Sequence, residues 1–589
     1  MAAQGPAVPV LLRLVAAFLA LFALFALPAA ASPTRAPPTL YHNATVYTVS
    51  SPAIADAFVV HDGVFIETGS FKALSRRHYH AHHVDLGGLT VIPGLIDSHA
   101  HLFHLGYSLT AADLVGARSL DDVRARLVAY LDANPDTTWL VGNGWDHTQW
   151  GNAAAPFPTS ADLDAHPRLA SVPIVLYRID YHAVWLNKRA LDALGTLPAT
   201  VKGGEIIRDA TSGAPTGVFL DNAMDLVDSV SPTPSESQMR RALRHATDEC
   251  LKYGITTVHD AGIPPSTIEF YRAAARRGDL PLRIFGMATC AARNTVCDIE
   301  PFTDPSGRLT VRAVKLFVDG ALGSWGAALD APYSDRPSQT GLMRLDDDAL
   351  LPLIEAWTKR GFQVGTHAIG DRANRVTIDA YEHIITARPG ADLRFRIEHA
   401  QILSQRDIAR VGALGILPCV QPTHATSDMG YAEARLGPER IKGAYAWRSL
   451  IRAGASRLPL SSDFPVERVN PMLGIFAAVE RTDASGAPEG GWKPEERLSR
   501  VEALKGFTSD AAYAAFQEKL VGRIARGMKA DFVVVDRDFM RLPAAQILET
   551  KVAVTMIDGE CAYYDEESII GRAVCAGQGK KGKHDRSEL

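Results

Sequence analysis

The feature that most constrains the fold is a unit that repeats along the middle of the chain. Each unit is a short apolar or β-branched run that ends in polar residues, followed by a longer segment with apolar residues at helical spacing. Counting the opening run, the eight runs cover residues 91–101, 254–262, 281–288, 311–320, 361–370, 393–401, 415–424 and 457–465. Eight strands that alternate with helices predict a (β/α)8 barrel, a TIM-like fold of the α/β class, whose chemistry lies at the carboxyl ends of the strands.

Two regions fall outside this repeat. Residues from about 110 to 245 form a large insertion after the first barrel strand, and we expect this insertion to shape or cover the pocket. Residues 32–90 and 526–570 are strand-rich, so we expect the two chain ends to form one β-sandwich beside a barrel of residues 91–525. Residues 571–589 are predicted to be a polar tail.

The amino terminus predicts export. Residues 14–27 are an unbroken apolar run that follows Arg13 and precedes a proline and three alanines, which is typical of a signal peptide, here residues 1–31 with cleavage near Ala31. The run is shorter than the roughly 20 residues that a bilayer requires, so an uncleaved anchor is the weaker alternative and no stable membrane span is expected after cleavage. The final RSEL matches a lumenal retention signal only in part. The protein is therefore expected in the secretory pathway, either secreted or in the endoplasmic reticulum lumen.

Composition limits the classes of partner and the cellular compartment that we expect. The chain has 61 basic and 66 acidic residues and a formal net charge of -5, so a nucleic acid partner is not expected. In an oxidising lumen, Cys290 with Cys297 is the first candidate disulfide and Cys561 with Cys575 the second. The sequon at Asn43 would carry a glycan there. Whether the chain forms a homodimer stays open.

The polar residues at the predicted strand ends share one chemistry. They are His99 and His101 on the first strand, Lys315 on the fourth, His367 on the fifth, His399 on the sixth and Asp463 on the eighth. Alternate residues of a strand point to one side, so His99 and His101 can bind the same ion. A single histidine in such a place is more often a packing residue, but six suitable residues at successive strand ends predict a site for one or two divalent ions, with zinc favoured.

These motifs resemble those of the amidohydrolase superfamily, and specifically its family 3, in the branch similar to N-substituted formamide deformylases. The resemblance rests on VIPGLIDSHAH, VKLFVDGALGSWGAAL, THAIGDRAN, RIEHAQ, SSDFPVERVNP and GRIARGMKADFVVVD, which together span nearly the whole chain after the signal run. VIPGLIDSHAH alone marks only the superfamily.

The resemblance implies a role for each strand-end residue. It places His99, His101, His367 and His399 as metal ligands and Asp463 as both a ligand and the catalytic group that moves the proton. It implies a carboxylated Lys315 that bridges two ions; a free ammonium cannot bind metal, so the alternative is an ion-paired lysine. The implied reaction is hydrolysis of a carbon–nitrogen bond in a small molecule by a metal-activated water.

Substrate recognition is less defined. The resemblance draws attention to Trp145, Asp146 and His182 as substrate-binding residues, with packing in the inserted region as the alternative for the tryptophan-rich stretches. Tyr181 stands where similar sequences carry glycine, which predicts a narrower pocket.

Further polar residues follow the strands. Asp260, Asp319 and Asp371 are expected to orient ligands or loops. Gln421 and His424, after the seventh strand, are either pocket residues or part of an ordinary polar loop.

Two alternative functions remain open. The first is a deaminase of the same fold with one ion, held by His99, His101, His367 and Asp463, beside an unmodified lysine. The second is a catalytically silent scaffold, against which the intact ligand set argues, because ionisable groups are costly to bury without a function.

Overall fold

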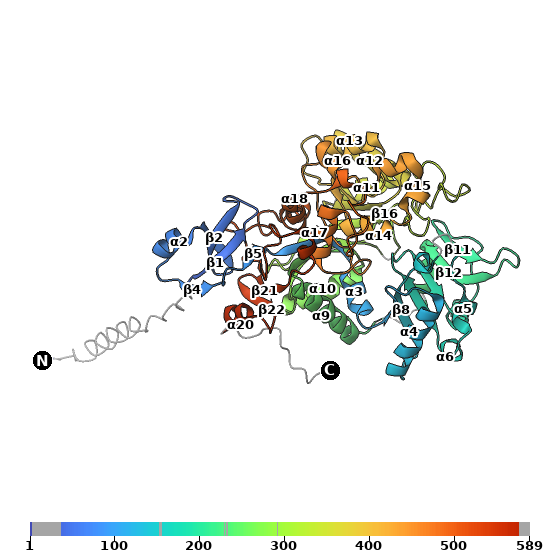
Figure 1. Ribbon diagram of the computed structural model, residues 1–589, viewed down its shortest axis with the longest axis horizontal. Coiled ribbons are helices and arrows are strands. Elements are labelled where there is room, and N and C mark those ends of the chain that lie inside the picture. Colours follow the sequence, from blue (N-terminus) through green and yellow to red (C-terminus); the bar gives the residue numbers. More distant parts are fainter. Residues whose placement is uncertain (3–36, 152–155, 229, 231–233, 291, 577–589) are drawn as a thin grey trace.

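The computed structural model describes residues 1–2, 37–151, 156–228, 230, 234–290 and 292–576 (Figure 1). The predicted signal peptide lies almost wholly outside these residues, as does most of the polar tail. Across the described part of the chain, no helix is both long enough and apolar enough to cross a membrane. Three sheets organise this part of the molecule.

The two chain ends build the first sheet together. Its strands are β1 (Thr39–Tyr47), β2 (Ile54–His61), β3 (Val64–Gly69), β4 (His82–Asp85), β5 (Thr90–Pro93), β20 (Phe532–Val535), β21 (Val552–Ile557) and β22 (Glu560–Tyr564). The order is β22-β21-β20-β5-β1-β2-β3, with β4 also paired to β1. In Figure 1 the blue amino-terminal strands and the red carboxyl-terminal strands lie next to each other. The predicted pairing of the two ends is therefore present, but as one continuous hydrogen-bonded sheet rather than two separate ones.

Aromatic rings fill the core of this terminal sheet. Tyr41 of β1, Phe58 of β2 and Phe65 of β3 pack with Phe532 of β20, and all four side chains are buried. The rings of Phe58 and Phe532 meet in a T-shaped, edge-to-face arrangement with 5.0 Å between their centroids. Because strands from both ends share this core, neither end is expected to fold without the other. Helices α2 (Phe71–Arg77) and α20 (Ile569–Cys575) flank the sheet.

The second sheet is a nearly closed ring of parallel strands. They are β6 (Leu95–Ala100), β13 (Ile255–Ile263), β14 (Arg283–Ala288), β16 (Leu309–Phe317), β17 (Gln363–Ala368), β18 (Arg396–His399) and β19 (Leu417–Cys419), with β15 (Phe302–Thr303) antiparallel on β16. Their residues are buried almost throughout, as expected for parallel strands covered on both faces. The opening apolar run is divided between two sheets, since β5 ends before Gly94 and β6 begins after it. A Cβ at residue 94 would lie 2.3 Å from Thr256 Oγ1, so this close approach requires glycine.

The eighth position of the ring is occupied by residues 459–464 rather than by a regular strand. Leu460 forms a parallel bridge with Val420 on one side. On the other side, the Asp463 amide donates to His99 O at 2.9 Å, and the His101 amide donates to Phe464 O at 2.9 Å. This segment therefore joins the last strand of the sheet to the first.

Helices surround the ring, mostly between its strands. They are α3 (Leu102–Ser108), α9 (Glu236–Lys252), α10 (Pro265–Arg277), α11 (Leu350–Lys359), α12 (Asp371–Ala387), α13 (Gln405–Leu414), α14 (Pro422–Asp428), α15 (Ala432–Arg440), α16 (Trp447–Arg452), α17 (Pro471–Glu480), α18 (Arg500–Lys505) and α19 (Ala511–Ala514). Local signals set several ends: Ser235 and Gln238 form a capping box at the start of α9. Gly415, at φ 65°, ends α13.

One expected helix is missing from the described residues. The strict alternation of strands and helices predicts a helix between β14 and β16, but the described part of that stretch holds turns, β15 and a disulfide between Cys290 and Cys297. The stretch TCAARNTVCDIEPFTDPSGR is rich in turn-forming residues and lacks apolar residues at helical spacing, which explains the difference.

The third sheet lies within the inserted region. Its strands are β7 (Ala112–Asp113), β8 (Leu140–Trp145), β9 (Ile174–Arg178), β10 (Ala183–Leu186), β11 (Gly204–Arg208) and β12 (Pro215–Asp221), accompanied by α4 (Leu120–Ala133), α5 (Ser160–Asp164), α6 (Pro167–Ala170), α7 (Lys188–Ala193) and α8 (Asp225–Asp228). It has a hydrophobic cluster on each face. In Figure 1 this sheet lies on the opposite side of the ring from the terminal sheet.

Both predicted disulfides are confirmed. Cys290 pairs with Cys297, and Cys561 of β22 pairs with Cys575 of α20. Among the described residues, the remaining cysteines, Cys250 and Cys419, are buried thiols.

Candidate metal centre and active-site cavity

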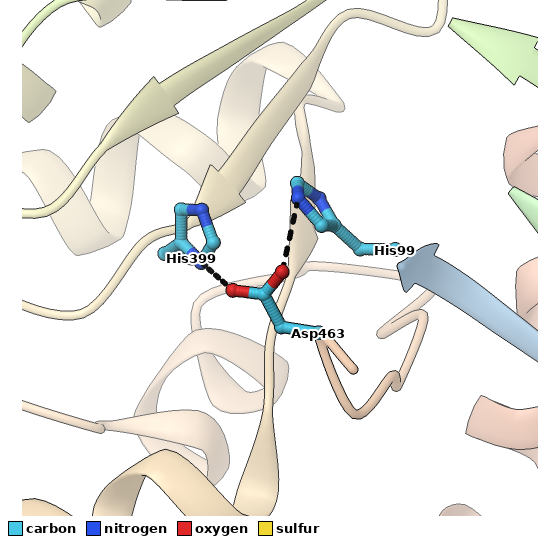
Figure 2. A group of neighbouring side chains, drawn as sticks. All are labelled: His99, His399 and Asp463. Carbon is cyan, nitrogen blue, oxygen red and sulfur yellow. Dashed lines mark ion pairs between the residues drawn. The ribbon is translucent and has the colours of Figure 1, made fainter. Parts of the chain in front are cut away.

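Three of the predicted strand-end residues converge most closely. His99 comes from β6, His399 from the end of β18, and Asp463 from the segment in the eighth position. Figure 2 shows the Asp463 carboxylate between the two imidazoles, with Oδ1 3.6 Å from His99 Nε2 and Oδ2 3.8 Å from His399 Nδ1. One donor atom from each residue lies within 4.8 Å of the others. These are spacings at which one ion can be shared.

The backbone at two of these residues is unusual. His399 has φ 77° and Asp463 has φ 61°, in a region that side-chain-bearing residues rarely adopt. Such conformations persist only where the surroundings hold them, and they cluster at functional sites. At Asp463 the surroundings include Asp97, whose carboxylate accepts hydrogen bonds from Ser462 Oγ at 2.6 Å and from the Ser462 amide. Burial raises the pKa of Asp97 to about 7.

The remaining predicted histidines lie next to this group. His101 Nε2 is 3.2 Å from Asp463 Oδ1. The His367 ring centroid is 4.6 Å from that of His399, and His367 Nε2 lies 3.5 Å from Asp319 Oδ1 without a hydrogen bond. All four histidines therefore gather at one end of the ring, although His101 and His367 are outside the tightest group.

Lys315 contacts a predicted ligand directly. Its Nζ lies 2.9 Å from His99 Nε2, and the side chain is buried. Burial lowers the pKa of Lys315 to about 8, because the ammonium loses its hydration. The lysine is thus in place beside the metal group.

A buried carboxylate orients His99 from behind. Glu398 Oε2 lies 2.5 Å from His99 Nδ1, and Arg396 Nε donates to Glu398 Oε1 at 2.7 Å. A carboxylate at Nδ1 leaves the Nε2 lone pair of His99 available, which is how many metal-binding histidines are held. Sequence reasoning missed Glu398, although its position immediately before His399 in RIEHAQ was visible.

The donor set fits a divalent cation. Burial, reinforced by the charge of Lys315, lowers the pKa of His99 well below its usual value, so His99 is neutral and able to bind metal. Burial alone would raise the pKa of Asp463, but the neighbouring imidazoles of His99 and His101 outweigh burial and lower it. Asp463 Oδ1 and His367 Nε2 are buried and have no hydrogen-bond partner in the part of the chain that the structure describes. Such atoms are expected to have a partner that is not part of the chain.

A cavity of about 640 Å³ opens onto this centre. His367, His399 and Asp463 line it from the ring, and Asp146 and His182 line it from the inserted region. The cavity is within the usual volume for small-molecule sites. The inserted region thus forms part of the pocket wall, as expected.

The residues expected to contact substrate differ in position. His182 faces the cavity, and its Nδ1 lies 2.6 Å from Asp221 Oδ1. Asp146 also lines the cavity and is paired with the buried Arg178 at 2.5 Å. Trp145 is fully buried in the core of the inserted sheet, donates from Nε1 to Leu176 O at 2.8 Å, and is absent from the cavity wall. This placement favours the packing interpretation for Trp145.

Tyr181 has φ 56°, a conformation that glycine adopts without strain. The tyrosine ring does not line the cavity; it stacks on Tyr177 and donates from its hydroxyl to Asn143 Oδ1 at 3.0 Å. The substitution at this position therefore does not narrow the cavity directly.

The other flagged polar residues have clear partners. Asp319 accepts hydrogen bonds from the amides of Ile369, Gly370 and Ala328, so it orders the loop beside His367. Asp260 accepts from the Leu102 amide and from Tyr271, while Asp371 accepts from the Asp330 amide. Gln421 Oε1 lies 2.9 Å from His399 Nδ1 and so orients that imidazole.

Taken with a nearly closed parallel sheet, this histidine and aspartate group defines the class of metal-dependent hydrolases. Comparison with known proteins agrees: the amidohydrolase family matches residues 82–563, and the chain belongs to this family. A Bacillus subtilis (strain 168) protein named as the amidohydrolase YtcJ is 32% identical over 89% of this chain and 99% of its own length.

Two further similarities extend the comparison. The N-substituted formamide deformylase of Arthrobacter pascens is 29% identical over 82% of this chain and 89% of its own. A solved structure of an uncharacterized metal-dependent hydrolase from Pyrococcus horikoshii OT3 has a TM-score of 0.70 and 27% identity, covering 86% of this chain and 99% of that one.

Proposed function

We propose that this hydrolase cleaves a carbon–nitrogen bond in a small amide or formamide at the cavity floor. The single observation that carries the proposal is the Asp463 carboxylate, which lies between His99 and His399 and lines the cavity. The similarity to a formamide deformylase over most of the chain supports the bond type.

His99, His101, His367, His399 and Asp463 would hold one or two divalent ions, with zinc favoured by the imidazole and carboxylate donors. When bound, such an ion lowers the pKa of a water and polarises a carbonyl. The finer fold assignment, a (β/α)8 barrel beside the continuous terminal sheet, belongs to the same proposal, and the segment at Leu460 would be its eighth strand position.

Asp463 would move the proton. Among the described residues, its Oδ1 has no hydrogen-bond partner and lies 3.2 Å from His101 Nε2, so it is free to accept a proton from the attacking water. The same oxygen then delivers that proton to the leaving nitrogen. Its low pKa keeps the carboxylate ready as the base at neutral pH.

Lys315 would become carboxylated in a site with two ions. The ammonium first loses one proton; the neutral amine then attacks the carbon of carbon dioxide, forms a carbamate and releases a second proton, so the lysine changes from cation to anion. Its lowered pKa increases the neutral fraction. Without this modification, the alternative is one ion at His99, His399 and Asp463, and Lys315 would then have to give up its contact with His99 Nε2 so that this nitrogen can bind the ion. This one-ion site is closer to the deaminase alternative, although the deaminase is predicted to bind its ion with His99, His101, His367 and Asp463.

Substrate contacts are proposed for Asp146 and His182, which line the cavity. We propose a secretory location as well, supported by the apolar run at residues 14–27, by two disulfides and by the exposed Asn43. A mass decrease on removal of N-glycans, absent in Asn43→Gln, would test that location.

The proposed reaction is tested with Asp463→Asn on a panel of N-alkyl and N-arylalkyl formamides and amides. Wild type should release amine, and the variant should lose turnover while keeping its fold, because asparagine cannot accept the proton. Release of ammonia from amidine-type substrates, with no amide cleavage, would instead support the deaminase. An active Asp463→Asn would contradict the assigned proton transfer.

A further inference from the structure

A histidine outside the expected metal set also faces the centre. His424 lies in α14, which starts directly after β19, at the same end of the ring as His399 and Asp463. It is 8% exposed and lines the cavity. The sequence alone is compatible with either a pocket position or an ordinary polar loop for His424; the structure places it in the pocket wall.

The two ring nitrogens of His424 have different surroundings. Nδ1 lies 3.1 Å from Gln401 Nε2. An amide nitrogen only donates, so Nδ1 accepts and the proton of the neutral imidazole is on Nε2. Nε2 lies 3.7 Å from Asp463 Oδ2, and a carboxylate on that side also favours the proton there. The Nε2–H is thus directed toward the reaction centre.

This donor has no partner within the described chain. Nε2 of His424 is buried without a hydrogen bond, and its 3.7 Å distance to Asp463 is too long for one. The ring is nearly parallel to that of His399, with an interplanar angle of 17° and centroids 5.9 Å apart. Packing and Gln401 therefore hold the imidazole in one orientation, with a buried N–H that lacks an acceptor. Buried donors normally have one.

We propose that His424 is a catalytic residue that donates a hydrogen bond from Nε2 to the carbonyl oxygen of the substrate, and that Gln401 is the residue that positions it. This assignment rests on the proposed hydrolysis at Asp463. A donor beside the group that handles the proton stabilises the negative charge that develops on the carbonyl oxygen during attack.

The first test compares two substitutions of His424. His424→Leu removes the donor and should lower kcat about 100-fold, with KM changed by less than about 3-fold, because the contact strengthens in the transition state. His424→Gln returns an N–H donor and should recover at least about 10-fold of that loss. His245→Gln, the same change at an exposed helix residue, should match wild type. Metal content and thermal midpoint, measured on every variant, should be unchanged.

The second test is a double-mutant cycle. Gln401→Leu should reduce kcat in the wild-type background and have little further effect in the His424→Leu background, because Gln401 acts through His424. An equal loss in both backgrounds would show that Gln401 acts independently and would overturn its positioning role.

The remaining outcomes separate the two proposals. Near-wild-type kcat in His424→Leu would overturn the assignment. So would a clear loss of metal and stability in both His424→Leu and His424→Gln. In either case, turnover by the wild-type protein would still support the proposed function. A wild-type protein that binds metal but hydrolyses no member of the panel would overturn the proposed function and this assignment with it.

Discussion

His99 Nδ1 lies 2.5 Å from Glu398 Oε2, and both side chains are fully buried. Glu398 in turn accepts hydrogen bonds from Arg396, which also donates to Ser98 O at 2.6 Å. The orientation of the first predicted ligand is therefore set by a charged network inside the ring rather than by the strand alone.

Glu398→Gln should weaken metal binding by about 10- to 100-fold, the usual effect of removing a carboxylate behind a ligand histidine. The reason is that glutamine fixes the His99 tautomer less strongly and leaves Arg396 without its anionic partner. Titration with a chelator of known affinity would measure this. Glu489→Gln, at an exposed position, is the matched control; equal affinity in both variants would show that Glu398 does not support the site.

Arg283→Met should destabilise the protein by about 3–5 kcal/mol, because it leaves the buried carboxylate of Asp531 without its cation. Arg283, on β14, donates to Asp531 at 2.8 and 3.1 Å and to Asp558 at 2.5 Å, which joins the ring to the terminal sheet. Urea unfolding would give the difference, with Arg276→Met at an exposed position as control. A loss below about 1 kcal/mol, the range of exposed pairs, would contradict the role of this contact.

Glu502 should give a pH-dependent contribution to stability. Both of its carboxylate oxygens lie 2.7 Å from the Arg448 guanidinium, and hydrogen bonding to Arg448 lowers the pKa of Glu502 from 4.5 to about 2. A lowered pKa stabilises the fold above about pH 4.5, and this stabilisation is lost as the pH falls toward 2.

Wild type should therefore exceed Glu502→Gln in stability by up to about 1 kcal/mol at pH 6, with the difference shrinking by pH 3. Thermal unfolding at both pH values would measure it. A difference that grows on acidification would show that the ion pair is not its source.

The sequence predicted the parts of the fold that local patterns determine. Periodic apolar runs located the ring strands, and polar strand ends located His99, His399 and Asp463, because parallel strands end at one edge. The pairing of both disulfides also followed from spacing. The helix expected between β14 and β16 is absent from the described residues, because this stretch has turn-forming residues and lacks apolar residues at helical spacing.

Contacts between distant residues were harder to predict. Glu398 behind His99, Gln401 beside His424, and Arg178 beside Asp146 depend on how strands and the inserted region come together. Trp145 illustrates the converse, since an aromatic residue in a motif can be either a core or a pocket residue until its burial is known.

The most direct test of the central claim is the metal content per chain of purified protein, measured by elemental mass spectrometry beside His99→Ala. The account predicts one or two divalent ions per wild-type chain, activity that is lost on chelation and restored by zinc, and a reduced content in His99→Ala. A wild-type chain that neither contains nor takes up a divalent ion, or full occupancy in His99→Ala, would contradict the assignment of this cluster as the catalytic metal centre.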